Sequence, residues 1–347
     1  MRLTSTVLAV VIAALIGAAI WIVIRRALRG SRMRPVLTNH SPAERNVETA
    51  LLHRSEALAS LTALAAGVCA TALTWQVGAW WPQGYGLAYA VSASVGALTG
   101  LVAFNVYPRR TWNSAPGTRT HAELVPRGPG SFARQWVFAL PLATAFTLIL
   151  GLVLAGLHSS TDENGLHRLY QRRELSGWGV EDGQIVDVQY GLSSSGPFPG
   201  WYYGVPVLVG TVLLIIVVYW SLRRIAAAPR PTSPALYDAD TALRSRRTVF
   251  VMATSSAALA FQVAGLLAIG GTVLRASHLD AVPTTDTLAT VDSVPVEPGH
   301  TLALIAILAS LVVAAAAVVL FAKGLTVVAA LWSTGKASRR PEDAPVP

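Results

Sequence analysis

Seven long apolar runs without a single charged residue constrain this chain more than any other feature of its sequence. Each run is long enough for a helix to cross a hydrocarbon core about 30 Å thick. Backbone polar groups in lipid must bond within their own segment, which makes helices the expected spanning form. The sequence therefore predicts an all-α integral membrane protein with about seven transmembrane helices. Their expected ranges are 4–24, 57–79, 86–107, 136–157, 202–222, 249–273 and 301–322.

Composition agrees with a membrane protein and disfavours a water-soluble globule. Only 13% of the 347 residues are charged and mean hydropathy is +0.50, whereas soluble domains have about 25% charged residues. The first run is followed by Arg25, Arg26 and Arg29, so we expect an uncleaved helix there and not a removed signal peptide. The great excess of Arg over Lys favours a high-GC bacterial genome.

The charges between the runs predict an orientation. The segments 25–56, 108–135 and 223–248, with the tail from residue 323, hold 22 of the 27 basic residues and 8 of the 18 acids. Cytoplasmic loops of membrane proteins carry an excess of Lys and Arg. We therefore expect the N-terminus outside, the C-terminus in the cytoplasm, and a plasma-membrane location. Basic clusters beside apolar runs also fit contact with anionic lipid headgroups better than nucleic-acid binding, which we do not expect.

An internal duplication is indicated by two stretches 192 residues apart. Ser41–Arg54 and Ser233–Arg246 share seven of fourteen residues without a gap, and each follows an apolar run that ends in paired arginines. The sequence thus predicts one polytopic membrane domain, 1–340, with three helices, a connecting fourth and three helices again. Its parts are repeat one (1–107), a connecting helix and outer loop (108–200) and repeat two (201–332), followed by a disordered tail (341–347).

The repeated stretch also predicts where two helices begin. Ser41 with Pro42, and Ser233 with Pro234, are pairs that suit the N-cap and first turn of a helix. A helix starting near residue 42 would run through the second span and project about four turns into the cytoplasm. Such a projection can be a simple interfacial helix or a docking surface for a partner protein.

Small residues predict close helix packing. The third run carries Ala88, Ser92, Gly96 and Gly100 at four-residue spacing, and the second carries Ala59, Ala63, Gly67 and Thr71. Ridges of this kind allow helix backbones to approach closely in membranes. Because a very short turn joins the two runs, we expect them to pack against each other within one molecule.

Chemistry-bearing groups are scarce in the spans. We find no ionisable residue in any of the seven runs, although ion-coupled carriers usually need one. The strongest polar candidates are Gln76 and Gln262, which would line a polar cavity between the repeats if the chain were a permease. No catalytic residue, cofactor motif or phosphate-binding loop is evident.

Two outer segments, 158–200 and 274–300, are long enough to form a small cap. The first begins with a partly helical pattern through Leu166 and Tyr170, and the alternation over Gln184–Gln189 predicts a short strand or hairpin. His158, His278 and His300 are weak candidates for a metal site, because no pair of them has a recognised ligand spacing. We expect scattered histidines and no bound metal.

These features favour a non-enzymatic multi-pass protein that is a membrane subunit of, or binds a partner in, a larger complex. The partner would be a cytoplasmic or membrane protein. A transporter or permease component without an intramembrane coupling-ion site is the alternative, motivated by the parallel repeats. An outer-face sensor comes third, and a membrane enzyme using the outer histidines comes last.

Overall fold

The computed structural model describes residues 43–108, 128, 130–181, 184–229, 231, 236–283 and 291–337. Within them, six helices are long and apolar enough to cross a membrane. The chain is therefore a multi-pass membrane protein. The first expected span, 4–24, lies outside the described residues, and so do Ser41, Pro42, Ser233 and Pro234. The six helices are α2 (Ala43–Trp80), α3 (Leu87–Val106), α4 (Gln135–Leu157), α5 (Trp201–Ala227), α6 (Tyr237–Ser277) and α7 (Gly299–Ala337).

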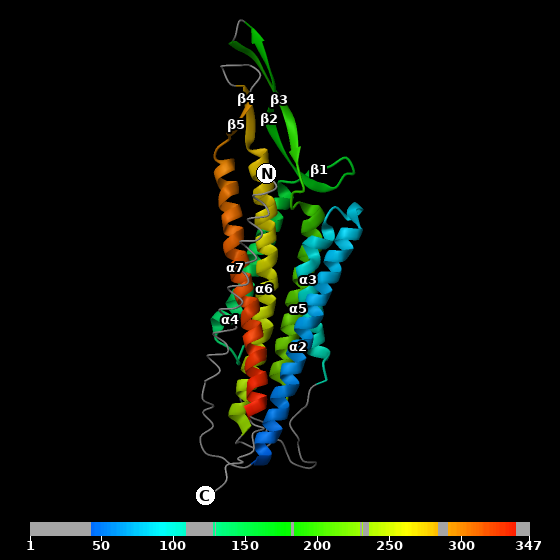
Figure 1. The fold of residues 1–347 in the computed structure, drawn as a ribbon, viewed down its shortest axis with the longest axis vertical. Helices are drawn as coiled ribbons and strands as arrows, with labels where there is room; N and C mark the ends of the chain where they lie inside the picture. Colours follow the sequence, from blue (N-terminus) through cyan, green and yellow to red (C-terminus); the bar gives the residue numbers. More distant parts are fainter. Residues whose placement is uncertain are drawn as a thin grey trace.

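Three of these helices are much longer than the apolar runs they contain. α2 has 38 residues, α6 has 41 and α7 has 39, which at 1.5 Å per residue is nearly twice the thickness of the hydrocarbon core. The strands gather at one end of the bundle (Figure 1), here called the outer end, and the opposite end is called the inner end. α2 begins at the inner end, and α6 extends there beyond its apolar run.

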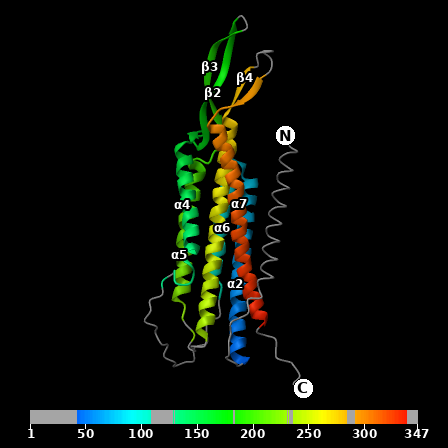
Figure 2. The same ribbon diagram turned by 90° about the vertical axis from the view of Figure 1, so that its left-hand side faces the viewer.

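The helices pack as two antiparallel pairs with two further helices on one side. α2 packs on α3 and α6 packs on α7, while α2 also meets α7 and α3 also meets α6. α5 lies against α3, α4 and α6, and α4 lies against α6 and α5. Figure 2 shows α4 and α5 together on the side of α6 away from α2. α6 is thus the central helix of the described bundle.

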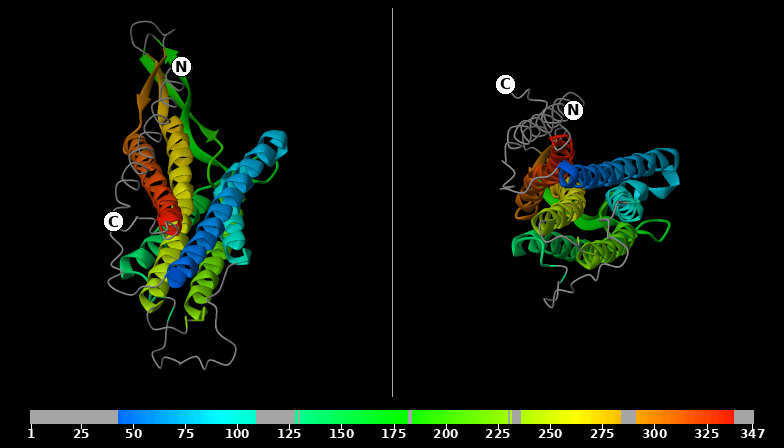
Figure 3. Two further views of the ribbon diagram at one scale, coloured as in Figure 1. Left: turned by 60° about the horizontal axis from the view of Figure 1, so that its bottom comes forward. Right: turned by 90° about the horizontal axis from the view of Figure 1, so that it is seen from below.

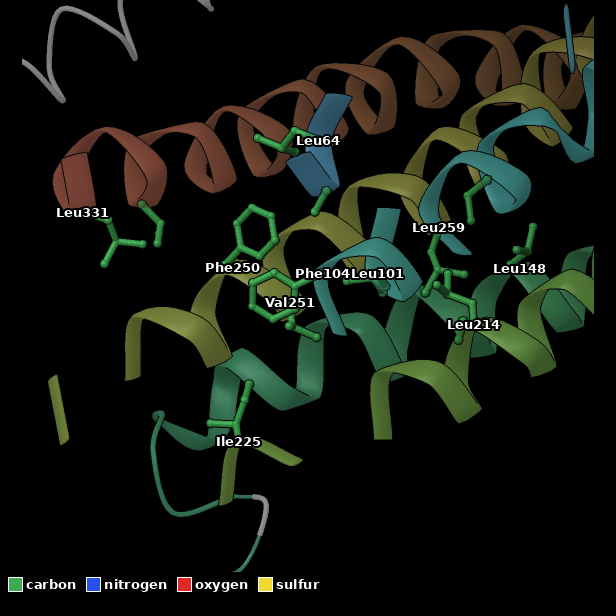
Figure 4. Packing of buried hydrophobic residues seen from close by; sticks show 14 of the residues in the cluster. Leu64, Leu101, Phe104, Leu148, Leu214, Ile225, Phe250, Val251, Leu259 and Leu331 are labelled. Atoms are coloured by element: carbon green, nitrogen blue, oxygen red, sulfur yellow. The ribbon is translucent and has the colours of Figure 1, made fainter. Parts of the chain in front are cut away.

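Apolar side chains fill the interior where α3, α4, α5 and α6 meet. Phe104 and Phe250 lie with their ring centroids 5.1 Å apart, and Leu148, Leu214 and Leu259 are almost fully buried beside them (Figure 4). In lipid the hydrophobic effect does not drive helices together, so this dense packing contributes through dispersion contacts. Packed apolar side chains therefore fill this part of the described bundle.

The α2–α3 pair is packed through small residues. A Cβ atom added to Gly100 would lie 2.8 Å from the Ala63 carbonyl oxygen, and one added to Gly67 would lie 2.9 Å from the Gly96 carbonyl oxygen. Ala88 and Ser92 are also buried on the same ridge of α3. The ridge that the sequence singled out thus lies in the contact between the two helices.

The outer segments form two antiparallel ribbons. β1 (Ser160–Thr161), β2 (His167–Glu181) and β3 (Gln184–Ser195) make one sheet, and β4 (Leu279–Pro283) pairs with β5 (Val291–Pro295). The expected helical pattern through Leu166 and Tyr170 is wrong, because β2 begins at His167 and Leu166 precedes it outside any helix. Asp162 accepts hydrogen bonds from the backbone N–H groups of Asn164 and Leu166. These bonds form a turn that competes with helix formation.

A cluster of polar contacts attaches this cap to the outer helix ends. Arg168 pairs with Asp162 and stacks on Tyr85, with 3.8 Å between the guanidinium carbon and the ring centroid. Tyr203 donates a hydrogen bond of 2.6 Å to the Tyr85 carbonyl oxygen. Desolvation raises the pKa of Asp162, but hydrogen bonds from the Leu166 N–H group and Arg168 lower it by more. The pKa of Asp162 is therefore below its ordinary value. The carboxylate is therefore ionised at neutral pH.

Gly100 and Gly265 offer a matched test of the small-residue packing. We expect Gly100→Ala to lower the melting temperature in detergent, because overpacking against a backbone carbonyl costs about 1–3 kcal/mol. A Cβ at Gly265 of α6 would meet no atom within 4 Å. Gly265→Ala should therefore leave stability unchanged or raise it, since Ala favours a helix by about 0.5–1 kcal/mol. A Gly100→Ala protein as stable as the Gly265→Ala protein would contradict the packing described here.

Candidate functional site

Three arginines within one turn of α6 form the most concentrated polar site of the described bundle. Arg244, Arg246 and Arg247 lie near the inner end of α6, and each reaches a different neighbouring helix. We call them the α6 arginines. Figure 3 shows from below how the inner ends of the helices surround α6.

Arg247 forms an ion pair with Glu56 of α2. The Glu56 side chain is completely buried and Arg247 is only 11% exposed. Removing charges from water is costly, so a buried pair is stable only when geometry and further hydrogen bonds offset the loss. Replacing one partner alone would leave a buried charge. The pair therefore links α2 to α6 near the inner end of the bundle.

Arg244 closes the inner end of α5. It pairs with Asp240 one turn earlier on α6 at 2.8 Å, and its remaining donors point at the last turn of α5 and the two residues that follow it. The carbonyls at a helix C-terminus lack partners within the helix and carry partial negative charge. A guanidinium supplies both the hydrogen-bond donors and the positive charge that these carbonyls lack, because it is a cation with five donors in a fixed fork. Arg244 donates to the carbonyl oxygens of Ile225 (2.9 Å), Ala226 (3.2 Å), Ala228 (2.9 Å) and Pro229 (3.0 Å).

Arg246 and Arg224 make two further links of the same kind. Arg246 donates to the Thr334 hydroxyl of α7 at 3.3 Å. Arg224 of α5 donates to the Asn105 carbonyl oxygen at 2.6 Å, in the last turn of α3. The Asn105 side chain in turn donates to the Ser221 hydroxyl of α5 at 2.6 Å. Arginines thus connect the inner ends of all the described helices except α4.

The sequence alone did not reveal this cluster. Arg244, Arg246 and Arg247 belong to the segment 223–248, whose basic residues the sequence predicts to be cytoplasmic and to contact anionic lipid headgroups. The structure continues α6 back to Tyr237 and α2 back to Ala43, so these charges lie between helices. The i,i+4 spacing of Asp240 and Arg244 was the available signal, since pairs at this spacing lie on one helix face.

The two glutamines proposed for a polar cavity lie in different surroundings. Gln262 is buried and donates to the Ser94 hydroxyl of α3. Gln76 is exposed on the surface of α2. In the described part of the chain no hydrogen bond joins the two amides, and Gln262 acts as a packing contact between α6 and α3.

The outer histidines lie at helix ends. His158 and His278 each contact a backbone carbonyl four residues earlier, Leu154 at 2.8 Å and Leu274 at 2.7 Å. His300 lies 3.9 Å from Glu297. Among the described residues, which include all three histidines, no group of three or more metal-ligating side chains is placed to hold an ion. The arrangement can therefore cap helices but offers no assembled metal centre.

No protein-family model, no curated protein and no solved structure matches this chain. Its functional interpretation therefore depends on its own residues and geometry.

Arg244 can be tested against an exposed arginine of α5. We expect Arg244→Lys to destabilise the protein by about 1.5–3 kcal/mol, because an ammonium group cannot serve a fan of four carbonyls and hydrogen bonds to charged groups contribute about this much. Arg223 is exposed, so Arg223→Lys should change stability by less than about 0.5 kcal/mol. Unfolding free energy in detergent micelles is the measurement. Equal effects of the two substitutions would show that Arg244 does not cap α5.

Proposed function

We propose that this chain is a non-enzymatic membrane subunit that holds a partner protein at its inner, cytoplasmic face. The observation that carries the proposal is the α6 arginines, which hold the projecting inner helix ends in one arrangement. A rigid surface binds with a smaller loss of conformational freedom than a mobile one. We define the inner platform as 49–56 of α2, 237–248 of α6 and 327–334 of α7.

The inner platform has both a buried side and an exposed side. Leu52, Leu243 and Leu331 are buried within it, whereas Asp238, Thr241 and Ala242 are exposed. The spacing of these three exposed residues puts them on one face of α6. This face is the surface proposed for the partner, which fits a cytoplasmic protein or the cytoplasmic part of a membrane protein.

The proposed location is the plasma membrane, with the chain crossing seven times. In this arrangement 4–24 is the first span, the N-terminus is outside and the arginine-rich inner end is cytoplasmic. The excess of Lys and Arg in the inner segments supports this orientation. Anionic lipid headgroups are the proposed contacts of the exposed inner arginines.

The proposed domain organisation is a single membrane domain, 1–340, built from a parallel duplication. Helix adjacency supports this: α2 packs on α3 and α7, and α6 packs on α7 and α3. Exchanging α2 with α6 and α3 with α7 leaves these neighbours unchanged. α4 would then be the connecting helix between repeats.

The transporter alternative receives less support from the same geometry. It needs a polar cavity between the repeats, but Gln262 bonds to Ser94 within the bundle and Gln76 lies exposed elsewhere. The buried cluster around Phe104, Leu214 and Leu259 is apolar. A permease would need groups that replace the hydration of its solute.

Two exposed alanines provide the test of the proposed partner surface. Membranes would be solubilised in mild detergent, and proteins retained by wild type, Ala242→Arg and Ala227→Arg would be quantified. Ala227 is exposed at the inner end of α5, outside the inner platform. We expect Ala242→Arg to lose a retained protein at least tenfold and Ala227→Arg to keep it. Retention that neither substitution alters, or no specific retention at all, would overturn the proposal.

A further inference from the structure

A groove runs between the two helix pairs in the middle of the bundle. It encloses about 540 Å³ and is lined by α2, α3, α6 and one residue of α7, Phe321. Figures 1 and 3 show why it exists: α2 and α7 approach each other toward the inner end and diverge toward the outer end. The α6 residues that line the groove, Phe250 to Ala258, lie just beyond the α6 arginines.

The walls of the groove present no polar group to a ligand. Besides Trp75, the polar side chains that line it are Thr71 and Thr254. Each hydroxyl already donates to a carbonyl of its own helix, Gly67 at 3.0 Å and Phe250 at 2.8 Å. The Trp75 indole N–H donates to Ser92 at 3.1 Å. An occupant must therefore be apolar along its whole length in the groove.

Side chains on the groove side of α2 are exposed, whereas the corresponding side chains of α6 are buried. In the most apolar stretch of α6, 44% of the residues are buried, against 22% in α2. At the spacing of 192 residues, Val68 of α2 corresponds to Ala260 of α6. Val68 is 56% exposed and Ala260 is 1% exposed. Ala72 and Ala264 differ in the same direction. Among the described residues, α2 thus lacks a neighbour that α6 has.

α5 shows which neighbour is absent from the described bundle. α5 packs on α3 and on α6, so its counterpart in the other repeat would pack on α7 and on α2. In the sequence that counterpart is the apolar run 4–24, which precedes α2 as α5 precedes α6. This step rests on the duplication proposed above.

We propose that the segment 4–24 of the same chain lies across this groove, against α2 and α7. Its 21 residues are enough to cross the membrane, and residues 25–42 connect it to the inner end of α2. Eighteen extended residues reach about 60 Å, so this connection can place the segment at any side of the bundle. Ala9, Ala13 and Gly17 recur every four residues, which suits close approach to the exposed wall of α2.

Pairs of engineered cysteines in the full-length chain test this placement. The native Cys69 is exposed on α2, so Cys69→Ala is the background. A protease site in the connection 25–42 lets a disulfide be read as two fragments that separate only after reduction. Ala13→Cys would be combined with Ala72→Cys in the groove or, as control, with Phe146→Cys, an exposed residue of α4.

We expect oxidation in membranes to link Ala13→Cys to Ala72→Cys at least tenfold faster than to Phe146→Cys. Because a disulfide needs Cα atoms within about 7 Å, Ala9→Cys and Gly17→Cys would be scanned with Val68→Cys and Trp75→Cys to allow for rotation. Absence of any link in this scan would overturn the proposal. Links formed only between differently tagged copies would also overturn it, because they assign the groove to a second copy. Partner retention by the inner platform is measured separately, so either proposal can fail alone.

Discussion

A guanidinium buried among helices must find oppositely charged or carbonyl partners, and this requirement organises the inner end of the bundle. Arg247 finds Glu56 on α2, Arg244 finds Asp240 and the final carbonyls of α5, and Arg246 finds Thr334 on α7. Helix C-termini supply the carbonyls, so arginines at the inner side pair with unbonded backbone carbonyls. The same arginines contribute to the charge excess that sets the orientation of the chain. The α6 arginines thereby tie three other helices to one central helix.

The outer half of the bundle is held together by different contacts. There the helix pairs diverge, and α2 is held to α3 by the close contacts of Gly67 and Gly100. Packing of this kind holds a pair together without fixing its distance to the other pair. The groove between the two helix pairs is the consequence, and the apolar run 4–24 is the segment proposed to occupy it.

Apolar run length was enough to place the six described helices, because the cost of exposing backbone groups to lipid leaves few alternatives. The small-residue ridge through Gly96 and Gly100 was likewise readable from spacing. The two Ser-Pro pairs also predict helix starts near residues 42 and 234, and the structure begins α2 at Ala43 and α6 at Tyr237. The α6 arginines were missed because tertiary contacts decide whether a charge near a span faces lipid or another helix. The strand β2 was missed because the turn made by Asp162 prevails over a weak helical pattern.

A double-mutant cycle on Glu56 and Arg247 tests the central claim most directly, since each side chain lies on a different helix. Unfolding free energies would be measured in one detergent for wild type, Glu56→Gln, Arg247→Gln and the double variant. The account predicts that each single substitution costs about 3–5 kcal/mol, because it leaves a buried charge. The double variant should cost clearly less than the two single effects combined. Additivity within about 0.5 kcal/mol, as expected for independent sites, would contradict the account.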